Sequence, residues 1–218
     1  MPFVSATDGV PIHYKSRGTG RPIVLVHAWT MNGRFFEGNM QALSEKYRVI
    51  TIDMRGHGRS GKDLINLTMR QLGRDINSVL EHLDLRDVVL GGWSMGMAAT
   101  YNYVDQFGTD RLSGLISIDM SPRILTAEGW PHATYGGMTA EMSLGFQARI
   151  LDEGLPALAP EILPMTFSKD ARINRELAEL VEEESASVPA LAALALWVSM
   201  SHQDWRPLLP KIDVPLLV

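Results

Sequence analysis

The chain has 218 residues, of which 45% are hydrophobic and 21% charged, a composition typical of a folded globular protein rather than a disordered one. Its formal net charge of −5 and its lack of a basic block argue against binding to nucleic acid. Because the sequence holds no cysteine, disulfides, thiolate metal sites and thiol nucleophiles are excluded. No segment resembles a signal peptide or is long enough to span a membrane, so we expect a cytoplasmic protein that does not bind membranes.

Short β-rich runs separated by turns dominate the first part of the chain. Residues 3–6 and 12–15 flank Asp8-Gly9, a pattern that predicts a hairpin. Apolar runs without polar alternation indicate strands that are buried on both faces of a parallel sheet. These runs are residues 23–27, 49–53, 88–90 and 115–118, and residues 216–218 begin a further one.

Helices are expected between these strands. Residues 35–47 can be helical, and the segment after Thr68 gives the clearest signal, since Thr68 and Gln71 can form a capping box. Five apolar residues then fall at helical spacing: Leu72, Ile76, Val79, Leu80 and Leu83. A helix between two buried strands is a βαβ unit, so we predict an α/β fold with a mostly parallel sheet and helices on both faces.

The pattern changes between residues 121 and 210, where strand signals vanish, prolines recur, and Met, Ala and Leu dominate. Residues 170–188 and 190–200 are the best helix candidates there. We therefore expect three parts in the chain. Residues 1–120 form the α/β core, residues 121–210 a helical lid insertion, and residues 211–218 the start of a further core strand.

The strongest chemical signal is the G-x-S-x-G pattern Gly92-Trp93-Ser94-Met95-Gly96. It follows a buried strand and precedes small residues that can begin a helix. A sharp turn in this context holds its serine in a strained conformation with the hydroxyl exposed, which makes Ser94 a candidate nucleophile. The alternative is a glycine-rich turn with an incidental serine, and the strand–helix context disfavours it.

A second motif, HAWT (27–30), follows the strand at residues 23–27. In this layout the backbone N–H just past the turn helps to bind a developing oxyanion, so Trp29 is a candidate donor. Met95 supplies a second backbone N–H at a helix N-terminus, where the dipole also favours negative charge. We interpret His27 as a structural histidine rather than a general base, because it lies on the oxyanion side of the serine.

Residues 56–61 match the G-x-G-x-x-G pattern of dinucleotide-binding proteins. That fingerprint must open a helix directly, whereas polar residues separate this motif from the helix expected after Thr68. Nucleotide binding is therefore disfavoured, and we expect no cofactor. The six histidines are scattered without metal-ligand spacing, so we expect no metal site either.

Four segments together resemble the α/β-hydrolase superfamily: VLVHAWT (24–30), DMRGHGRS (53–60), GWSMG (92–96) and IDMSPR (118–123). Within it, nearly the whole chain is most similar to small esterases and cofactor-free haloperoxidases that carry a helical lid. The resemblance implies a serine hydrolase with Ser94 as nucleophile and the amides of Trp29 and Met95 as oxyanion donors. Ala28 replaces the glycine that usually follows the histidine.

A serine hydroxyl needs a base, normally a histidine that a carboxylate orients. The resemblance places the acid after the strand that begins at Leu216 and the histidine after one more strand. We therefore expect both beyond Val218, in a chain about 50–70 residues longer whose fold is incomplete here at its C-terminal end. Within the chain, Asp119 as acid and His132 or His202 as base are weaker alternatives: the sequence around Asp119 favours a turn that ends a strand, and no spacing requires either histidine to approach Ser94.

We expect hydrolysis of a small, fairly apolar ester or lactone through an acyl-serine intermediate. One alternative is perhydrolysis by hydrogen peroxide at the same serine, and another is a truncated, non-catalytic binding protein of this fold. The sequence does not set the oligomeric state. Six apolar side chains are candidates either for pocket lining or for packing: Trp29, Trp93, Met95, Met120, Met138 and Met142.

Overall fold

The computed structural model describes residues 2–162, 164 and 175–218. In this part of the chain a seven-stranded sheet has the order β1-β2-β4-β3-β5-β6-β7. The pairs β1–β2 and β2–β4 are antiparallel, and the pairs from β4 to β7 are parallel. The strands are β1 (Phe3–Ser5), β2 (Pro11–Arg17), β3 (Pro22–Val26), β4 (Arg48–Ile52), β5 (Val88–Trp93), β6 (Leu112–Ile118) and β7 (Leu216–Leu217).

The central strands are buried on both faces, as their unbroken apolar runs predict. Along β3, Val24 and Val26 join one hydrophobic core, whereas Ile23 and Leu25 join a second core that includes Met40 of helix α1 (Glu37–Leu43). Successive side chains of a strand point to opposite faces, so β3 contributes to both cores at once. The predicted α/β architecture with a mostly parallel sheet is confirmed.

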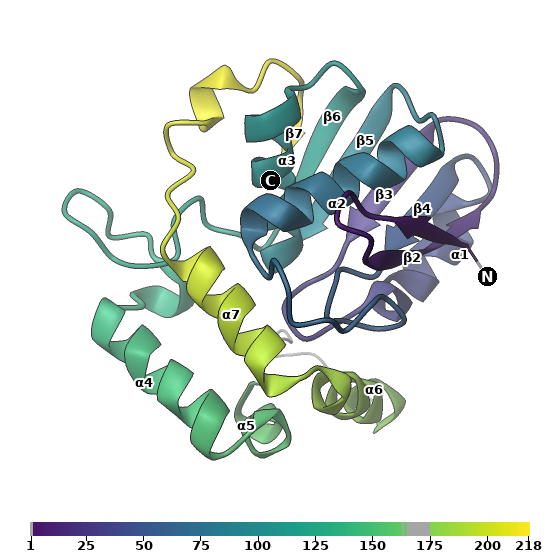
Figure 1. Ribbon diagram of the computed structural model, residues 1–218. Helices are drawn as coiled ribbons and strands as arrows, with labels where there is room; N and C mark the ends of the chain where they lie inside the picture. The colour runs from purple at the N-terminus through teal and green to yellow at the C-terminus, as the bar shows by residue number, and fades with distance from the viewer. Residues whose placement is uncertain (1, 163, 165–174) are drawn as a thin grey trace.

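Helices flank the sheet and gather in a second group beside it (Figure 1). Near the sheet lie η1 (Gly33–Phe36), α1 (Glu37–Leu43), α2 (Met69–His82) and α3 (Met95–Phe107). Between β6 and β7 the chain forms η2 (Thr134–Gly136), α4 (Ala140–Asp152), α5 (Leu155–Ile162), α6 (Arg175–Ser187), α7 (Ala190–Ser201) and η4 (Leu209–Lys211). Helices α4 and α7 pack together, as do α5 and α6, and the four lie to one side of the sheet in Figure 1. None of the described helices is both long and apolar enough to cross a membrane.

Several expected helix boundaries shift. The helix expected over residues 35–47 is split into η1 and the shorter α1. Helix α7 matches the segment 190–200, and α6 begins at Arg175, while residues 170–174 of the expected 170–188 helix lie outside the described residues. No specific segment was predicted for helices α4 and α5.

The predicted N-cap of α2 is confirmed, but its capping box is only half formed. The Thr68 hydroxyl accepts a hydrogen bond from the Gln71 backbone N–H at 3.2 Å. The reciprocal bond is absent within the described residues, because the Thr68 N–H donates to the Asn66 carbonyl at 2.8 Å instead. The Gln71 side-chain amide donates to Asp75 at 3.1 Å. The Gln71 side chain therefore binds the buried Asp75 carboxylate and does not cap the helix.

Candidate active site

The G-x-S-x-G motif forms a sharp turn between β5 and α3. Ser94 has φ 50° and ψ −116°, a conformation that L-residues rarely adopt, and its N–H donates to the Ile118 carbonyl at 2.9 Å. A Cβ at Gly96 would lie 2.6 Å from the carbonyl carbon of Val26 on β3, and one at Gly92 would lie 2.5 Å from the backbone of Gly96. Only glycine fits at both positions, so the two glycines allow the tight turn in which the Ser94 backbone is strained.

Ser94 lines a cavity of about 70 Å³ at the carboxyl ends of the parallel strands. Its side chain is half-buried, and its hydroxyl has no hydrogen-bond partner among the described residues. Ligands of open α/β sheets bind at this end of the strands. The cavity is lined by Ala28, Trp29, Met31, Trp93, Ser94, Asp119, Met120, Ile124, Thr134, Ile162, Trp197 and Met200.

Three of the six apolar pocket candidates line this cavity: Trp29, Trp93 and Met120. Met95 and Met138 pack in the main core instead, and Met142 on α4 is 54% exposed, so it belongs to neither the pocket nor the core. Sequence analysis did not single out the α7 residues Trp197 and Met200. The only local signal for them is that α7 is apolar on all sides, which indicates a buried helix but not a pocket wall.

Both proposed oxyanion donors have unpaired backbone amides. Among the described residues, no acceptor is assigned to the N–H of Trp29 or of Met95. Thr30, next to Trp29, has φ 60°, which is unusual for a β-branched residue. Its N–H donates to Nε2 of His57 at 3.2 Å, so the ring of His57 supports the strained turn.

Two buried histidines lie beneath this turn and hold it by hydrogen bonds. Nδ1–H of His27 donates to the Ala28 carbonyl at 2.8 Å, and its Nε2 accepts from the Met54 N–H at 2.9 Å. Nδ1–H of His57 donates to the Arg55 carbonyl at 3.0 Å. Burial lowers the pKa of His27 and lowers that of His57 to about 3. Both rings are therefore neutral at physiological pH and have their nitrogens occupied, which agrees with the structural interpretation of His27.

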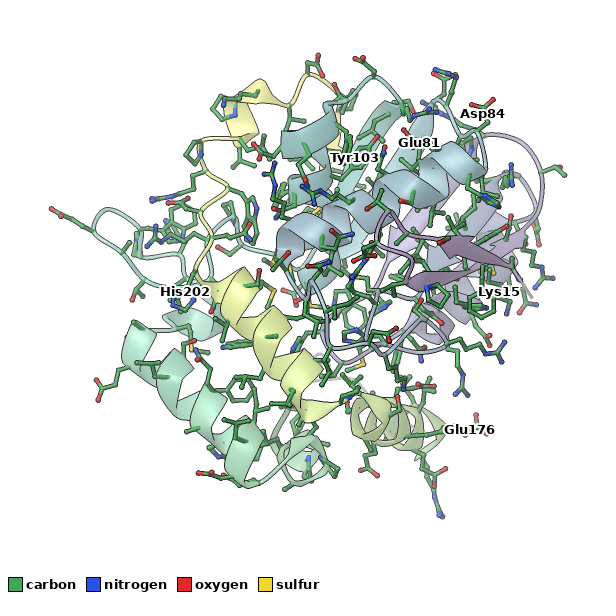
Figure 2. The ribbon with its side chains drawn as sticks, in the orientation of Figure 1. Lys15, Glu81, Asp84, Tyr103, Glu176 and His202 are labelled. Atoms are coloured by element: carbon green, nitrogen blue, oxygen red, sulfur yellow. The ribbon has the colours of Figure 1, made fainter. Side chains whose placement is uncertain are left out.

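The in-chain substitutes for the triad partners separate in space. Asp119, with φ 50°, lines the cavity beside Ser94. His132 is exposed and stacks edge-on against Trp130, and His202 is exposed at the C-terminal end of α7 (Figure 2). Neither ring lines the cavity, and none of the other described histidines does. The structure thus brings the carboxylate to the serine but not a histidine.

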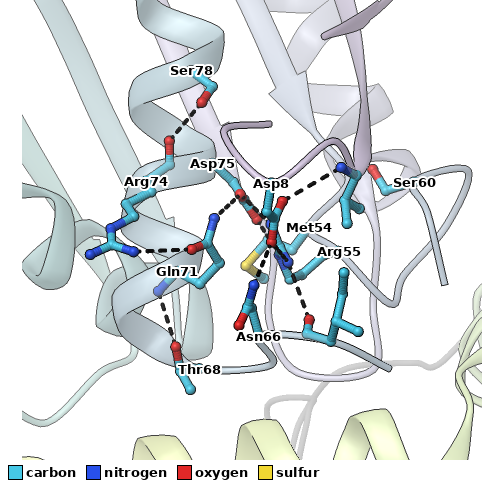
Figure 3. Close-up of polar contacts among 12 residues, drawn as sticks. Asp8, Met54, Arg55, Ser60, Asn66, Thr68, Gln71, Arg74, Asp75 and Ser78 are labelled. Carbon is cyan, nitrogen blue, oxygen red and sulfur yellow. Dashed lines mark hydrogen bonds and ion pairs between the residues drawn. The ribbon is translucent and has the colours of Figure 1, made fainter. Parts of the chain in front are cut away.

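A buried ion cluster anchors the loop after β4 (Figure 3). The Arg55 side chain is fully buried, and its Nε and Nη2 donate to Asp75 at 2.6 and 2.7 Å. Its Nη1 and Nη2 also donate to Asp8 at 2.8 and 3.0 Å, and Asn66 donates to the same carboxylate at 2.9 Å. The loop that carries the G-x-G-x-x-G pattern is therefore tied into the core, and α2 begins only at Met69, which supports the rejection of a dinucleotide site.

A larger cavity of about 520 Å³ lies elsewhere, between β2 and the loops after β3 and β4. Its charged groups are already paired: Lys15 with Glu37 at 2.9 Å, Arg34 with Glu184 at 2.6 Å, and His13 with Asp53 at 2.9 Å. None of its described non-glycine lining residues has the positive φ that strains the Ser94 turn. The smaller cavity is therefore the better candidate active site, although it has less volume.

A mostly parallel sheet with a strand–serine–helix turn defines an α/β hydrolase, and residues 21–147 match the family model of the alpha/beta hydrolase fold. The chain is 30% identical to the non-heme chloroperoxidase CPO-A1 of Kitasatospora aureofaciens, over 100% of this chain and 79% of that protein. The chain therefore belongs to the α/β-hydrolase superfamily, in its haloperoxidase-like esterase branch.

Solved structures agree with this assignment. An esterase from Exiguobacterium antarcticum superposes with a TM-score of 0.90 at 28% identity, over 98% of this chain and 78% of that one. A bromoperoxidase from Bacillus anthracis gives a TM-score of 0.91 at 27% identity, over 99% and 79% of the two chains. The prediction that the chain is an α/β-hydrolase enzyme is confirmed.

Proposed function

We propose that the protein hydrolyses a small carboxylic ester or lactone through an acyl-enzyme intermediate on Ser94. The observation that carries the proposal is the strained Ser94, whose half-buried hydroxyl faces a cavity and has no partner among the described residues. Relatives named as esterases support the ester as substrate class.

In the proposed reaction, Oγ of Ser94 attacks the ester carbonyl carbon while its proton passes to a general base. The resulting oxyanion accepts hydrogen bonds from the backbone amides of Trp29 and Met95, and each such donor contributes about 10²–10³ in rate. The tetrahedral species expels the alcohol, leaving an acyl-serine that water then hydrolyses. Asp119 lines this cavity, and we propose it as the carboxylate that orients the base.

The cavity favours a short acyl group. Its volume of about 70 Å³ is small beside the roughly 300–1,000 Å³ typical of small-molecule pockets, which favours a small acyl group. Trp197 and Met200 of α7 and Ile124 contribute apolar walls. All three lie within residues 121–210, which we propose act as a lid that limits acyl length.

Perhydrolysis is the second candidate, because relatives named as a chloroperoxidase and a bromoperoxidase cover nearly the whole chain. In that case hydrogen peroxide replaces water, attacks the acyl-serine and leaves as a peracid, which oxidises bromide. Adding hydrogen peroxide and bromide to acetate-containing assays distinguishes the two reactions. Bromination of monochlorodimedone that depends on Ser94 identifies a perhydrolase, whereas its absence leaves ester hydrolysis alone.

The test of the proposed function compares Ser94→Ala with the unchanged protein on p-nitrophenyl acetate. We expect the variant to lose turnover, and a fluorophosphonate probe to label Ser94 in the unchanged protein only. Ser44→Ala removes a hydroxyl of similar exposure remote from the cavity and serves as the matched control. Turnover retained by Ser94→Ala, or labelling at another residue, would refute the serine assignment.

A further inference from the structure

We propose that helix α7 positions the oxyanion donor through the side chain of Trp29, so that the helices after β6 help to set the active-site geometry as well as cover it. This inference rests on the proposed function, in which the Trp29 amide binds the oxyanion. The relevant segment is residues 28–31, here called the oxyanion loop.

The first support is a hydrogen bond between residues 164 positions apart in the chain. The indole N–H of Trp29 donates to the Ala193 carbonyl of α7 at 2.9 Å. The Trp29 residue is buried, with 9% of its surface exposed. Because a carbonyl oxygen has two lone pairs, Ala193 can accept this bond and still take part in the helix. The indole is therefore fixed at its polar end by backbone of α7 rather than by a mobile side chain.

The second support is an aromatic cluster that joins α4 and α7 to the Trp29 ring. The ring centroids of Trp197 on α7 and Phe146 on α4 each lie 5.6 Å from that of Trp29, and 4.8 Å from each other. Trp197 also donates its indole N–H to the Ser143 hydroxyl of α4 at 3.0 Å. These contacts leave the Trp29 side chain one packed arrangement.

The rest of the oxyanion loop is held from other directions. Val181 of α6 packs in a small hydrophobic cluster with Ala28 and Met31, and the hydroxyl of Ser185 on α6 donates to that of Thr30 at 3.3 Å. Beneath the loop, His57 accepts the Thr30 N–H. The Ala28 carbonyl, in the same peptide as the Trp29 amide, accepts hydrogen bonds from His27 Nδ1–H at 2.8 Å and from the Met31 N–H at 3.1 Å. The indole bond to Ala193 adds the constraint on Trp29 that comes from α7.

The consequence is a specific link between the lid and the transition state. The Trp29 amide contributes only while an oxyanion exists, so a misdirected amide lowers kcat and leaves ground-state binding largely intact. A small misplacement of a catalytic group costs up to about 10²-fold in rate. The indole of Trp29 is thus a positioning group, and its backbone amide is the catalytic one.

The experiment removes the indole N–H and keeps an aromatic ring. We expect Trp29→Phe to lower kcat for p-nitrophenyl acetate by about 10- to 100-fold, with KM within about two-fold of the unchanged protein. Site-specific replacement of Trp29 by benzothienylalanine, which exchanges only N–H for sulfur, should give the same loss without a packing defect. Trp130→Phe is the matched control, because it removes an indole bond to the Arg123 carbonyl at 3.2 Å outside the cavity, and its kcat should not change.

Four outcomes decide whether α7 positions the oxyanion donor. A kcat loss at Trp29 with both replacements, absent in Trp130→Phe, supports positioning by α7. An unchanged kcat in folded Trp29 variants overturns it, and so does a rise in KM alone, which assigns the ring to substrate binding. Turnover that survives in Ser94→Ala instead refutes the proposed function itself, so the two failures are distinguishable.

Discussion

Replacing Gly96 by alanine tests the steric basis of the serine turn. Gly96 lies in the first turn of α3, where intrinsic helix propensity alone predicts that Gly→Ala stabilises by about 1 kcal/mol. The structure predicts the opposite sign. The new Cβ would lie 2.6 Å from the Val26 carbonyl carbon and 2.8 Å from the His27 oxygen, and nearer still to the Val26 oxygen, whereas real Cβ atoms essentially never approach within 3.0 Å.

The magnitude follows from what blocks the methyl group. The blocking atoms are backbone atoms at the end of β3, which pairs with both β4 and β5, so no side-chain rotation can relieve the contact. Helix α3 would have to move away from the sheet and carry Ser94 with it. Overpacking costs about 1–3 kcal/mol and occasionally more, and a rigid backbone obstacle belongs at the upper end, so we expect a net loss of about 3 kcal/mol. For a chain of this length that is a fall in Tm of about 6–12 °C.

The chain offers a matched control at Gly145, an exposed position inside α4 where an added Cβ meets nothing within 4 Å. Gly145→Ala should raise the unfolding free energy by about 1 kcal/mol through helix propensity. Urea titrations followed by tryptophan fluorescence measure both variants, and fluorophosphonate labelling reports whether Ser94 has moved. If Gly96→Ala proves as stable as the unchanged protein, the close approach of α3 to β3 is not what requires glycine, and the reasoning is refuted.

Buried titratable residues give two further tests. The unfolding free energy should decrease as the pH falls from about 6.5 towards 3, by up to about 1.4 kcal/mol per pH unit for His57. In this window the unfolded chain protonates His57, whereas burial lowers its folded pKa to about 3. A pH series of urea titrations in which His57→Gln keeps the same slope would contradict this. Asp75→Ala should cost about 3–5 kcal/mol, because it leaves the buried Arg55 guanidinium half paired. Asp8→Ala should cost less, since that carboxylate is 17% exposed against 3% for Asp75; the reverse order in urea titrations would refute the argument.

The sequence predicts the sheet well where physical constraints are local. A strand buried on both faces, such as β3 or β4, has no polar alternation, and this is visible in five residues. The serine turn is visible for the same reason, since Gly92 and Gly96 respond to contacts with near neighbours and one adjacent strand. The end of β5 was predicted too early, because Gly91 and Gly92 have low strand propensity. Both glycines are nevertheless part of β5, because they pair with β3 on one side and β6 on the other.

The helices between β6 and β7 and the rest of the candidate site depend on contacts that no local sequence pattern encodes. Helix α5 contains Pro160, and a proline in the sequence normally argues for a helix boundary. The hydrogen bond between Trp29 and Ala193 joins segments 164 residues apart, so the sequence around either residue does not predict the contact. Asp119 shows the same limit. Its sequence suits a simple turn, and only the parallel pairing of β5 with β6 places it beside Ser94.

Backbone strain supports this cavity as the functional site independently of any relative. Thr30, Ser94 and Asp119 each have φ between 50° and 60°, and each follows a parallel strand, β3, β5 or β6, at its carboxyl end. The other described non-glycine residues with positive φ are Asn or Asp, which adopt positive φ in turns more readily than other residues. A threonine or a serine adopts it rarely. Such conformations cost on the order of 1–3 kcal/mol each and persist only where the surroundings impose them. Here His57 holds the amide of Thr30 and Ile118 holds that of Ser94. The strain at these adjoining strand ends, around a hydroxyl without a partner among the described residues, supports the proposed chemistry at Ser94.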